Sequence, residues 1–202
     1  TRRLSTSRRL TDSRIGSRFL FPGAGYGGSC FPKDVRALVE TAREHGYEMQ
    51  VVKAVESVND GQKGKLADMV FERFGGRIEG LRIALWGLSF KPETDDMREA
   101  PSLVIIKRLL EGGATVVAYD PEAMGETRRA LGDRITYAAR PMEAAKDADC
   151  LLVVTEWNEF RSPDFEELRG KMKQAVVFDG RNIWNPVDVR SKGFEYRCFG
   201  RP

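Results

Sequence analysis

The 202-residue chain has few of the side chains that build metal sites or disulfide frameworks. Its only histidine is His45, and its three cysteines, Cys30, Cys150 and Cys198, lack the short spacings typical of metal-ligand clusters. An odd number of cysteines argues for a reducing compartment, so we expect a cytoplasmic protein without a bound metal. His45 precedes Gly46 at an expected helix end, where capping is a more natural role than catalysis.

Long apolar runs and a strong charge imbalance are also missing. We find no transmembrane stretch and no secretory signal, and therefore expect no membrane contact. The 33 basic and 30 acidic residues give a formal net charge of +3, which provides no reason to expect nucleic acid as a partner. Residues 1–18 are the exception, since they are rich in arginine and serine. Such a run is typical of a nucleic-acid arm or a transit-like peptide, but we interpret residues 1–13 as a disordered or truncated end.

What the sequence does contain is a glycine-rich segment that ends in a cysteine. Gly23, Gly25 and Gly28 satisfy the dinucleotide fingerprint G-x-G-x-x-G, which normally follows a buried strand and opens directly into a helix. Here the apolar lead-in is short and ends at a proline, and Pro32 predicts that the next helix begins after the cysteine. We therefore interpret the segment as a substrate loop rather than a cofactor loop.

Cys30 lies just before the helix expected over residues 33–45. The positive end of the helix dipole favours a thiolate there; Lys33 adds to this effect and Asp34 opposes it. Glycine N–H groups nearby can hold an oxyanion during attack on a carbonyl, so the pattern indicates covalent catalysis. The alternative is an ordinary buried thiol, which is the role we expect for Cys150 and Cys198.

The rest of the chain predicts an α/β fold. A long helix is expected over residues 48–74, weakened in its middle by Gly61 and Gly64, and a helical region of this kind needs self-association or a neighbouring domain to be buried. Further along, strands alternate with helices, which predicts a parallel sheet. We expect strands at 82–88, 115–119, near 135, at 150–155 and at 175–179, with helices at 100–110, 142–146 and 165–172.

The carboxyl ends of parallel strands meet at one edge of a sheet, where ligands bind. The residues at or just beyond these ends are Phe90, Lys91, Asp120, Thr155 and Arg181, and we expect one crevice to collect them. The segment from Gly87 to Asp95 contains no G-x-G-x-x-G, so we do not expect an NAD site of the usual kind there.

A collinear series of motifs resembles the UDP-glucose/GDP-mannose dehydrogenase family, the nucleotide-sugar dehydrogenases that act through a catalytic cysteine. The series covers about residues 14–202. It comprises Arg14-Ile15-Gly16, Gly25 to Asp34, Val58-Asn59, Gln62-Lys63, Gly87 to Lys91, Asp95 to Ser102, Tyr119-Asp120-Pro121, Thr155-Glu156-Trp157, Glu159-Phe160 and Asp179-Gly180-Arg181.

The resemblance implies a helical central region with the cysteine loop over residues 14–76, which forms the dimer contact. It also implies a Rossmann-like UDP-binding domain over residues 77–202. Cys30 would be the nucleophile, and Asp34 would assist by hydrogen bonding or by orienting water. The implied substrate-binding residues are Arg14 (reaching a neighbouring subunit's substrate), Phe21, Pro22, Gly23, Ala24, Gly25, Tyr26, Gly27, Phe90, Lys91 and Arg181, with Asn182 as the alternative to Arg181. Lys33, Arg98 and Cys30 would contact the cofactor NAD.

The implied reaction oxidises UDP-glucose to UDP-glucuronate in two NAD-dependent steps, through a thiohemiacetal and a thioester on the cysteine. Family members are about twice as long as this chain and begin with an NAD-binding domain that we do not find, so we expect the chain to be inactive alone. Two alternatives stay open. One is a non-catalytic module that binds a nucleotide sugar and self-associates, and the other is a dehydrogenase of GDP-mannose or UDP-N-acetylmannosamine.

Overall fold

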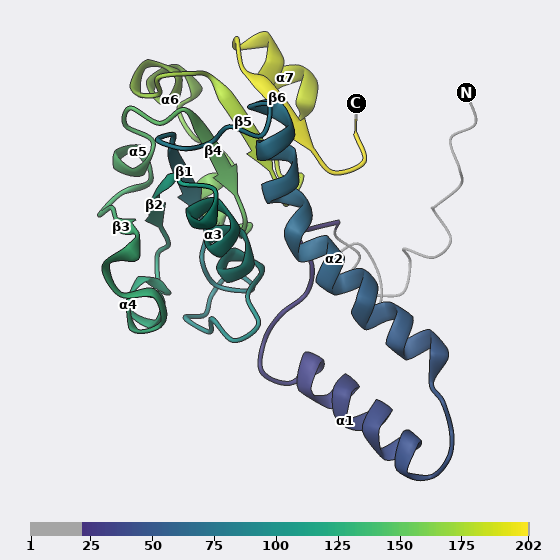
Figure 1. Cartoon of the computed structure of the whole chain (residues 1–202). Coiled ribbons are helices and arrows are strands. Elements are labelled where there is room, and N and C mark those ends of the chain that lie inside the picture. Colours follow the sequence, from purple (N-terminus) through teal and green to yellow (C-terminus); the bar gives the residue numbers. More distant parts are fainter. Residues whose placement is uncertain (1–21, 202) are drawn as a thin grey trace, which may run out of the picture.

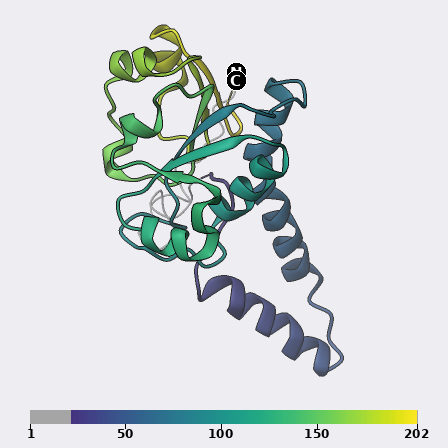
Figure 2. The same ribbon diagram turned by 60° about the vertical axis from the view of Figure 1, so that its left-hand side comes forward.

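Two helices precede the sheet, and the end of this pair that is far from the sheet projects away from the rest of the molecule (Figures 1 and 2). The computed structural model describes residues 22–201, so the predictions for Arg14 and Phe21 lie outside the described residues. Helix α1 spans Phe31–Glu44 and helix α2 spans Gln50–Arg73. We call this pair the helical hairpin.

The start of α1 confirms that the helix begins after the cysteine. Cys30 occupies the N-cap position, and Pro32 lies in the first turn, where its missing N–H removes no helical hydrogen bond. The helix ends at His45, whose Nδ1 lies 2.8 Å from the carbonyl oxygen of Thr41. The expected capping role of His45 is confirmed.

Helix α2 continues without a break through Gly61 and Gly64. Gly64 is buried, and a Cβ there would lie 2.5 Å from the guanidinium of Arg108, which donates to the Gly64 carbonyl at 2.8 Å. This glycine therefore permits close packing between α2 and the helix that carries Arg108, and that contact supports the helix where its propensity is weak.

The sheet has six parallel strands in the order β3-β2-β1-β4-β5-β6, which confirms the predicted α/β fold. The chain order reverses between β1 and β4, the switch point of a doubly wound sheet. The strands are β1 Arg82–Trp86, β2 Thr115–Tyr119, β3 Thr136–Tyr137, β4 Cys150–Val153, β5 Val176–Asp179 and β6 Glu195–Cys198. The helices between them are α3 Pro101–Glu111, α4 Met124–Leu131, α5 Pro141–Ala144, α6 Phe165–Lys171 and α7 Pro186–Ser191, with 3-10 turns η2 Gly132–Arg134 and η3 Asn158–Phe160.

Helices cover both faces of the sheet, and each face has its own apolar core. On one face, Leu66 and Val70 of α2 pack with Ile105 and Leu109 of α3. On the other face lies an aromatic cluster whose main members are Trp86, Phe160, Phe165, Trp184, Phe194 and Tyr196. The C-terminal half of α2 thus packs in the core beside the sheet, whereas its N-terminal half extends away from the sheet (Figure 1).

Candidate functional site

The glycine loop, residues 22–29, lies where α2 meets the loops that follow β1 and β5. A Cβ at Gly23 would overlap the guanidinium of Arg181, and a Cβ at Gly27 would overlap the backbone carbonyl of Glu99. The N–H of Gly28 donates to the carbonyl oxygen of Arg98 at 2.8 Å. Close approach to the sheet domain therefore requires these glycines, and the helix begins beyond them, unlike the helix of a dinucleotide fingerprint.

Helix α2 holds the other side of the glycine loop. Asn59 accepts from the N–H of Tyr26 at 2.8 Å and donates to its carbonyl oxygen at 3.2 Å, so one amide side chain fixes one residue from both sides. Gln62 donates to the carbonyl oxygen of Gly23 at 2.7 Å. The sequence analysis assigned these two residues no role, although their spacing of three places them on one helix face.

Cys30 is exposed at the N-terminus of α1. Its Sγ lies 3.5 Å from the Ser29 hydroxyl, and its carbonyl oxygen accepts the N–H of Asp34 at 2.8 Å. The carboxylate of Asp34 is largely exposed and lies 3.7 Å from the ammonium of Lys33. Cys30 is therefore accessible to a ligand, unlike an ordinary buried thiol.

The other two cysteines are buried, as predicted. Cys150 lies in β4 with no exposed surface, and burial raises the pKa of its thiol far above the usual range. Burial also raises the pKa of Cys198, with Asp179 adding to the effect. Both thiols are kept protonated and unreactive at neutral pH.

Arg98 lies at the edge of the glycine loop, where its carbonyl oxygen accepts the N–H of Gly28, two residues before Cys30. Its side chain is 71% exposed and is held by the Asp96 carboxylate through two hydrogen bonds of 2.9 Å. The hydrogen bond to Asp96 raises the pKa of Arg98, and negative charge on Cys30 adds a smaller contribution. The backbone of Arg98 is thus in contact with the loop that leads to Cys30, and the cofactor roles of both residues stay predictions.

Phe90 links the glycine loop to the end of β1. A Cβ on Gly28 would lie only 2.9 Å from the ring of Phe90, so the ring and the loop backbone are in direct contact. The ammonium of Lys91 lies 5.4 Å from the centre of that ring and is exposed. This pair presents an aromatic face and an exposed cation next to the loop.

Arg181 is largely buried against Gly23 and is paired with Glu156. Its Nη2 donates to Oε1 of Glu156 at 2.7 Å, and its Nε lies 2.6 Å from Oε2 without the alignment of a hydrogen bond. Asn182 instead exchanges two hydrogen bonds with the backbone of Phe199. Of the two residues between which the sequence left a choice, Arg181 is the one that faces the glycine loop.

The expectation that one crevice collects all the strand-end residues is wrong for Asp120 and Thr155. Both side chains are buried. Thr155 donates to the carbonyl oxygen of Ser89 at 2.6 Å. The Asp120 carboxylate accepts from the backbone N–H groups of Leu88, Ser89, Glu122 and Ala123 and from the indole of Trp157. The carboxylate at the end of β2, which meets the ribose in dinucleotide-binding sheets, is here fully occupied by the protein's own donors.

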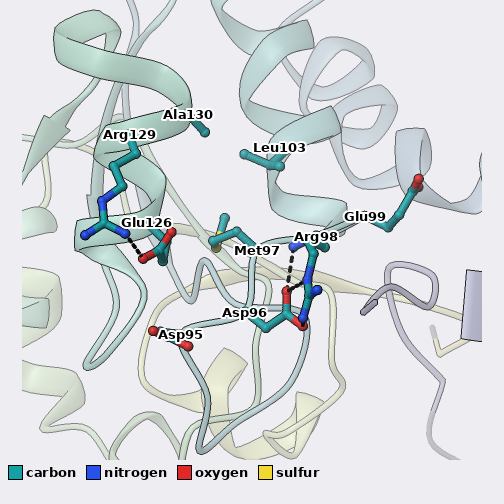
Figure 3. Close-up of a pocket in the computed structure, with 9 residues that line it drawn as sticks. All are labelled: Asp95, Asp96, Met97, Arg98, Glu99, Leu103, Glu126, Arg129 and Ala130. Carbon is teal, nitrogen blue, oxygen red and sulfur yellow. Dashed lines mark hydrogen bonds and ion pairs between the residues drawn. The ribbon is translucent and has the colours of Figure 1, made fainter. Parts of the chain in front are cut away.

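A cavity lies apart from most of these residues. It measures about 660 Å³ and is lined by the 95–99 loop, α3 and α4 (Figure 3). Figure 3 shows its two arginines turned onto carboxylates, Arg98 onto Asp96 and Arg129 onto Glu126. Asp95 and Glu99 make the lining acidic overall, which does not suit a diphosphate. Among the predicted site residues only Arg98 lines it, so this cavity does not coincide with the predicted site.

Residues 22–201 show no group of three or more His, Cys, Asp or Glu side chains arranged to hold a metal ion. Within the same residues, every helix is too short or too polar to span a bilayer.

These features define a doubly wound α/β domain joined to a helical hairpin that carries an accessible cysteine on a glycine loop. Residues 84–186 match the UDP binding domain of the UDP-glucose/GDP-mannose dehydrogenase family, and residues 8–61 match the central domain of the same family. The chain belongs to the UDP-glucose/GDP-mannose dehydrogenase family, which confirms the resemblance seen in its motifs. The proposed boundary between residues 76 and 77 falls between the two matches and stays a prediction.

Similar proteins are about twice as long as this chain. A UDP-glucose 6-dehydrogenase of Pseudomonas aeruginosa is 47% identical over 197 residues, which cover 95% of this chain and 44% of that protein. A UDP-glucose 6-dehydrogenase of Rhizobium meliloti is 47% identical over 191 residues and is also covered to 44%. A solved UDP-glucose dehydrogenase from Pyrobaculum islandicum has a TM-score of 0.79 at 34% identity, with 94% of this chain and 41% of that one covered. The chain therefore spans less than half the length of these relatives.

Proposed function

We propose that this chain is the catalytic-loop and UDP-binding part of an NAD-dependent UDP-glucose 6-dehydrogenase, which oxidises UDP-glucose to UDP-glucuronate. The observation that carries the proposal is the contact between the glycine loop and the UDP binding domain. The segment that presents Cys30 touches Phe90, Arg98 and Arg181, which come from three places in the UDP binding domain. A nucleotide sugar bound to that domain would place its sugar near the thiol.

The substrate would be held by both sides of this junction. Lys91, an exposed cation, suits the diphosphate, and Phe90 offers an apolar face. Arg181 and the backbone of Pro22 to Gly27 would contact the sugar, with Tyr26 packed edge-on against Phe31 at the base of the loop. Roles for Arg14 and Phe21 are part of the same proposal.

The residues proposed to meet NAD fit a cofactor that carries phosphate groups. Lys33 lies in the first turn of α1 and Arg98 on the loop that binds Gly28, and their side chains are 73% and 71% exposed, so N–H donors remain open to a ligand despite their carboxylate partners. NAD+, when bound, takes up the electrons of both oxidations. We propose that its main binding domain lies in the part of the relatives that this chain does not match.

Cys30 would carry the sugar between the two oxidations. Its thiolate adds to the C6 aldehyde carbon, and the carbonyl oxygen takes up a proton to give a thiohemiacetal. Loss of two electrons and two protons, as a hydride from the carbon and a proton from the hydroxyl, converts this adduct to a thioester, and the hydride goes to NAD+. Water then forms a bond to the acyl carbon, the carbon–sulfur bond breaks, and the carboxylate leaves. Asp34, in the first turn of α1, would orient that water through a hydrogen bond.

Calorimetric titration tests the substrate class. We expect UDP-glucose to bind more tightly than GDP-mannose or UDP-N-acetylmannosamine, and binding of either of the latter with higher affinity would redirect the proposal. A solved GDP-mannose dehydrogenase from Pseudomonas aeruginosa shares the fold at 21% identity and a TM-score of 0.69, so fold alone does not choose between these sugars.

Alkylation of Cys30 separates a catalytic chain from a non-catalytic binding module. In the catalytic case Cys30 should react with iodoacetamide faster than glutathione does, and UDP-glucose should slow that reaction. Equal rates, with UDP-glucose still bound, would favour the module. Without further residues the purified chain should not reduce NAD+ in the presence of UDP-glucose, and steady NADH formation would contradict this.

We also propose that the helical hairpin associates with a second copy of the chain. Val51, Val55 and Val58 repeat at spacings of four and three along one face of α2 and are 77%, 45% and 70% exposed. Phe31 and Leu38 of α1 are exposed by 57% and 52%. An apolar surface of this kind on a projecting element is typical of an association site.

A further inference from the structure

Glu99 joins three segments that are far apart in the sequence. It lies on the loop between β1 and α3. Its Oε2 accepts from the Lys63 ammonium of α2 at 3.1 Å, and its Oε1 accepts from Nη2 of Arg36 in α1 at 2.9 Å. The backbone carbonyl of the same residue packs against Gly27 of the glycine loop.

The surroundings of Glu99 show that this arrangement is under strong constraint. The side chain of Lys63 is only 6% exposed, and a buried ammonium requires a carboxylate partner. The backbone of Glu99 has φ of 56°, a left-handed conformation that costs a residue of this kind free energy. The hydrogen bonds from Lys63 and Arg36 lower the pKa of Glu99, so the carboxylate is charged at neutral pH and both contacts are ionic.

We propose that Glu99 is a positioning residue that fixes the helix of Cys30 relative to the UDP binding domain. The inference rests on the proposed function. Arg36 and Cys30 belong to the same rigid end of α1, whereas Glu99 belongs to the UDP binding domain. The carboxylate therefore sets the distance between the thiol and the residues proposed to hold the nucleotide.

A residue that aligns two parts should affect a ligand that spans both more than a ligand that binds one. UDP-glucose reaches from the domain to Cys30, whereas UDP contacts the domain alone. In Glu99→Gln we expect UDP affinity within about twofold of the unaltered chain, and protection of Cys30 from iodoacetamide by UDP-glucose about tenfold weaker, the factor for losing one charge-assisted hydrogen bond.

Two further variants control this measurement. Glu111→Gln removes an exposed carboxylate of α3 that is paired with Lys107 at 3.8 Å, and it should leave both ligands unchanged. Glu99→Asn removes the charge and tolerates the left-handed backbone better than glutamate does, so relief of the backbone offsets part of the cost of leaving Lys63 without a carboxylate, and this variant should also lose protection. If UDP and UDP-glucose weaken equally in both Glu99 variants, the residue is merely structural and the inference fails.

Hydrogen exchange provides a readout that needs no ligand. The N–H of Gly28 bonds the Arg98 carbonyl across the junction, so Glu99→Gln should speed exchange at Gly28 about tenfold, while amides of β4 keep their rates. Faster exchange throughout the sheet, or no change at Gly28, overturns the inference. If the unaltered chain binds no UDP-glucose, the proposed function fails, and the Gly28 exchange still decides the role of Glu99.

Discussion

The two halves of α2 differ in how far their apolar side chains are buried. In the C-terminal half, Leu66, Ala67 and Val70 have no exposed surface and form part of the core beneath the sheet. In the N-terminal half, Val51 and Val58 are more than two-thirds exposed. One continuous helix thus passes from a packed domain to a surface that no described residue covers, and its apolar residues serve two different purposes.

Polar side chains also fall into two groups, those that are buried with all their hydrogen bonds made and those that remain exposed. Within the sheet domain, the buried carboxylates Asp120 and Asp179 are fully used by the protein, Asp179 by three backbone N–H groups and the hydroxyl of Tyr196. Around Cys30, by contrast, Lys33, Asp34 and Arg98 remain largely exposed. Groups with saturated hydrogen bonds build the fold, and groups that keep open positions are those available to a ligand.

The largest effect is expected from removing a buried carboxylate whose hydrogen bonds are all made within the protein. Asp120→Ala leaves several buried donors without an acceptor, so we expect a loss of about 3 kcal/mol or more in the free energy of unfolding, measured in urea. Asp133→Ala, at an exposed position in η2, is the control and should change it by less than about 0.5 kcal/mol. Similar values for both variants would show that the network around Asp120 is dispensable.

Substitution by alanine should change the free energy of unfolding in opposite directions at Gly27 and Gly61. Gly27→Ala forces a Cβ into the Glu99 carbonyl and should destabilise by about 1–3 kcal/mol. A Cβ at Gly61, in the exposed part of α2, meets no described atom within 4 Å, so Gly61→Ala should stabilise by about 0.5–1 kcal/mol. Thermal unfolding of both variants checks the pair, and destabilisation by Gly61→Ala would reveal a contact on the hairpin.

Charge on the apolar face should break association without unfolding the chain. Val51→Asp places an acid in the first turn of α2, where the helix dipole tolerates it, and should shift the species seen by sedimentation towards the monomer. Val187→Asp is the matched control, since Val187 is 72% exposed in the first turn of α7. Unfolding free energies should change by less than about 0.5 kcal/mol in both. Equal sedimentation of the two variants would remove the hairpin as the association site.

The smallest effect concerns acid stability. Burial opposes ionisation of Asp149, but hydrogen bonds from the Arg82 N–H, Lys173 and Gln174 prevail and lower its pKa. A lowered folded-state pKa means that the stabilisation is complete above the unfolded value of about 3.9 and is lost as the pH falls through the folded value. Asp149→Asn should therefore flatten the decline of stability below pH 4 in urea titrations. If the decline of stability below pH 4 is the same in the variant, other carboxylates are responsible for it.

Most of the fold could be predicted from the sequence because its elements have clear periods. The strands at Arg82, Thr115 and Cys150 are continuous apolar runs, and each lies where the sequence predicted it. Helices α4 and α7 and strand β6 were not predicted. Helix α4 is mostly polar, α7 has six residues, and β6 alternates buried Tyr196 and Cys198 with half-exposed charges at the sheet edge, so none gives a strong apolar signal.

The site was predictable only where its logic is local. Pro32 predicts where the helix starts. Cys30 comes just before that start, at the exposed end of the helix. The partners that hold the loop are not local, since Tyr26 and Asn59 are 33 residues apart and Arg36 and Glu99 are 63 apart. Asp120 misled for the same reason, because its position at a strand end says nothing about which donors surround it in three dimensions.

Helix α2 has a mechanical consequence. Its 24 residues form a rod about 36 Å long at 1.5 Å per residue, anchored at one end in the core. Asn59 and Gln62 form hydrogen bonds with the glycine loop near the middle of that rod, and the exposed valines Val51, Val55 and Val58 lie towards its free end. A contact made at the free end of α2 can therefore tilt the helix about its buried end. Such a tilt would move the glycine loop, and with it Cys30, because the loop is bonded to the middle of the helix.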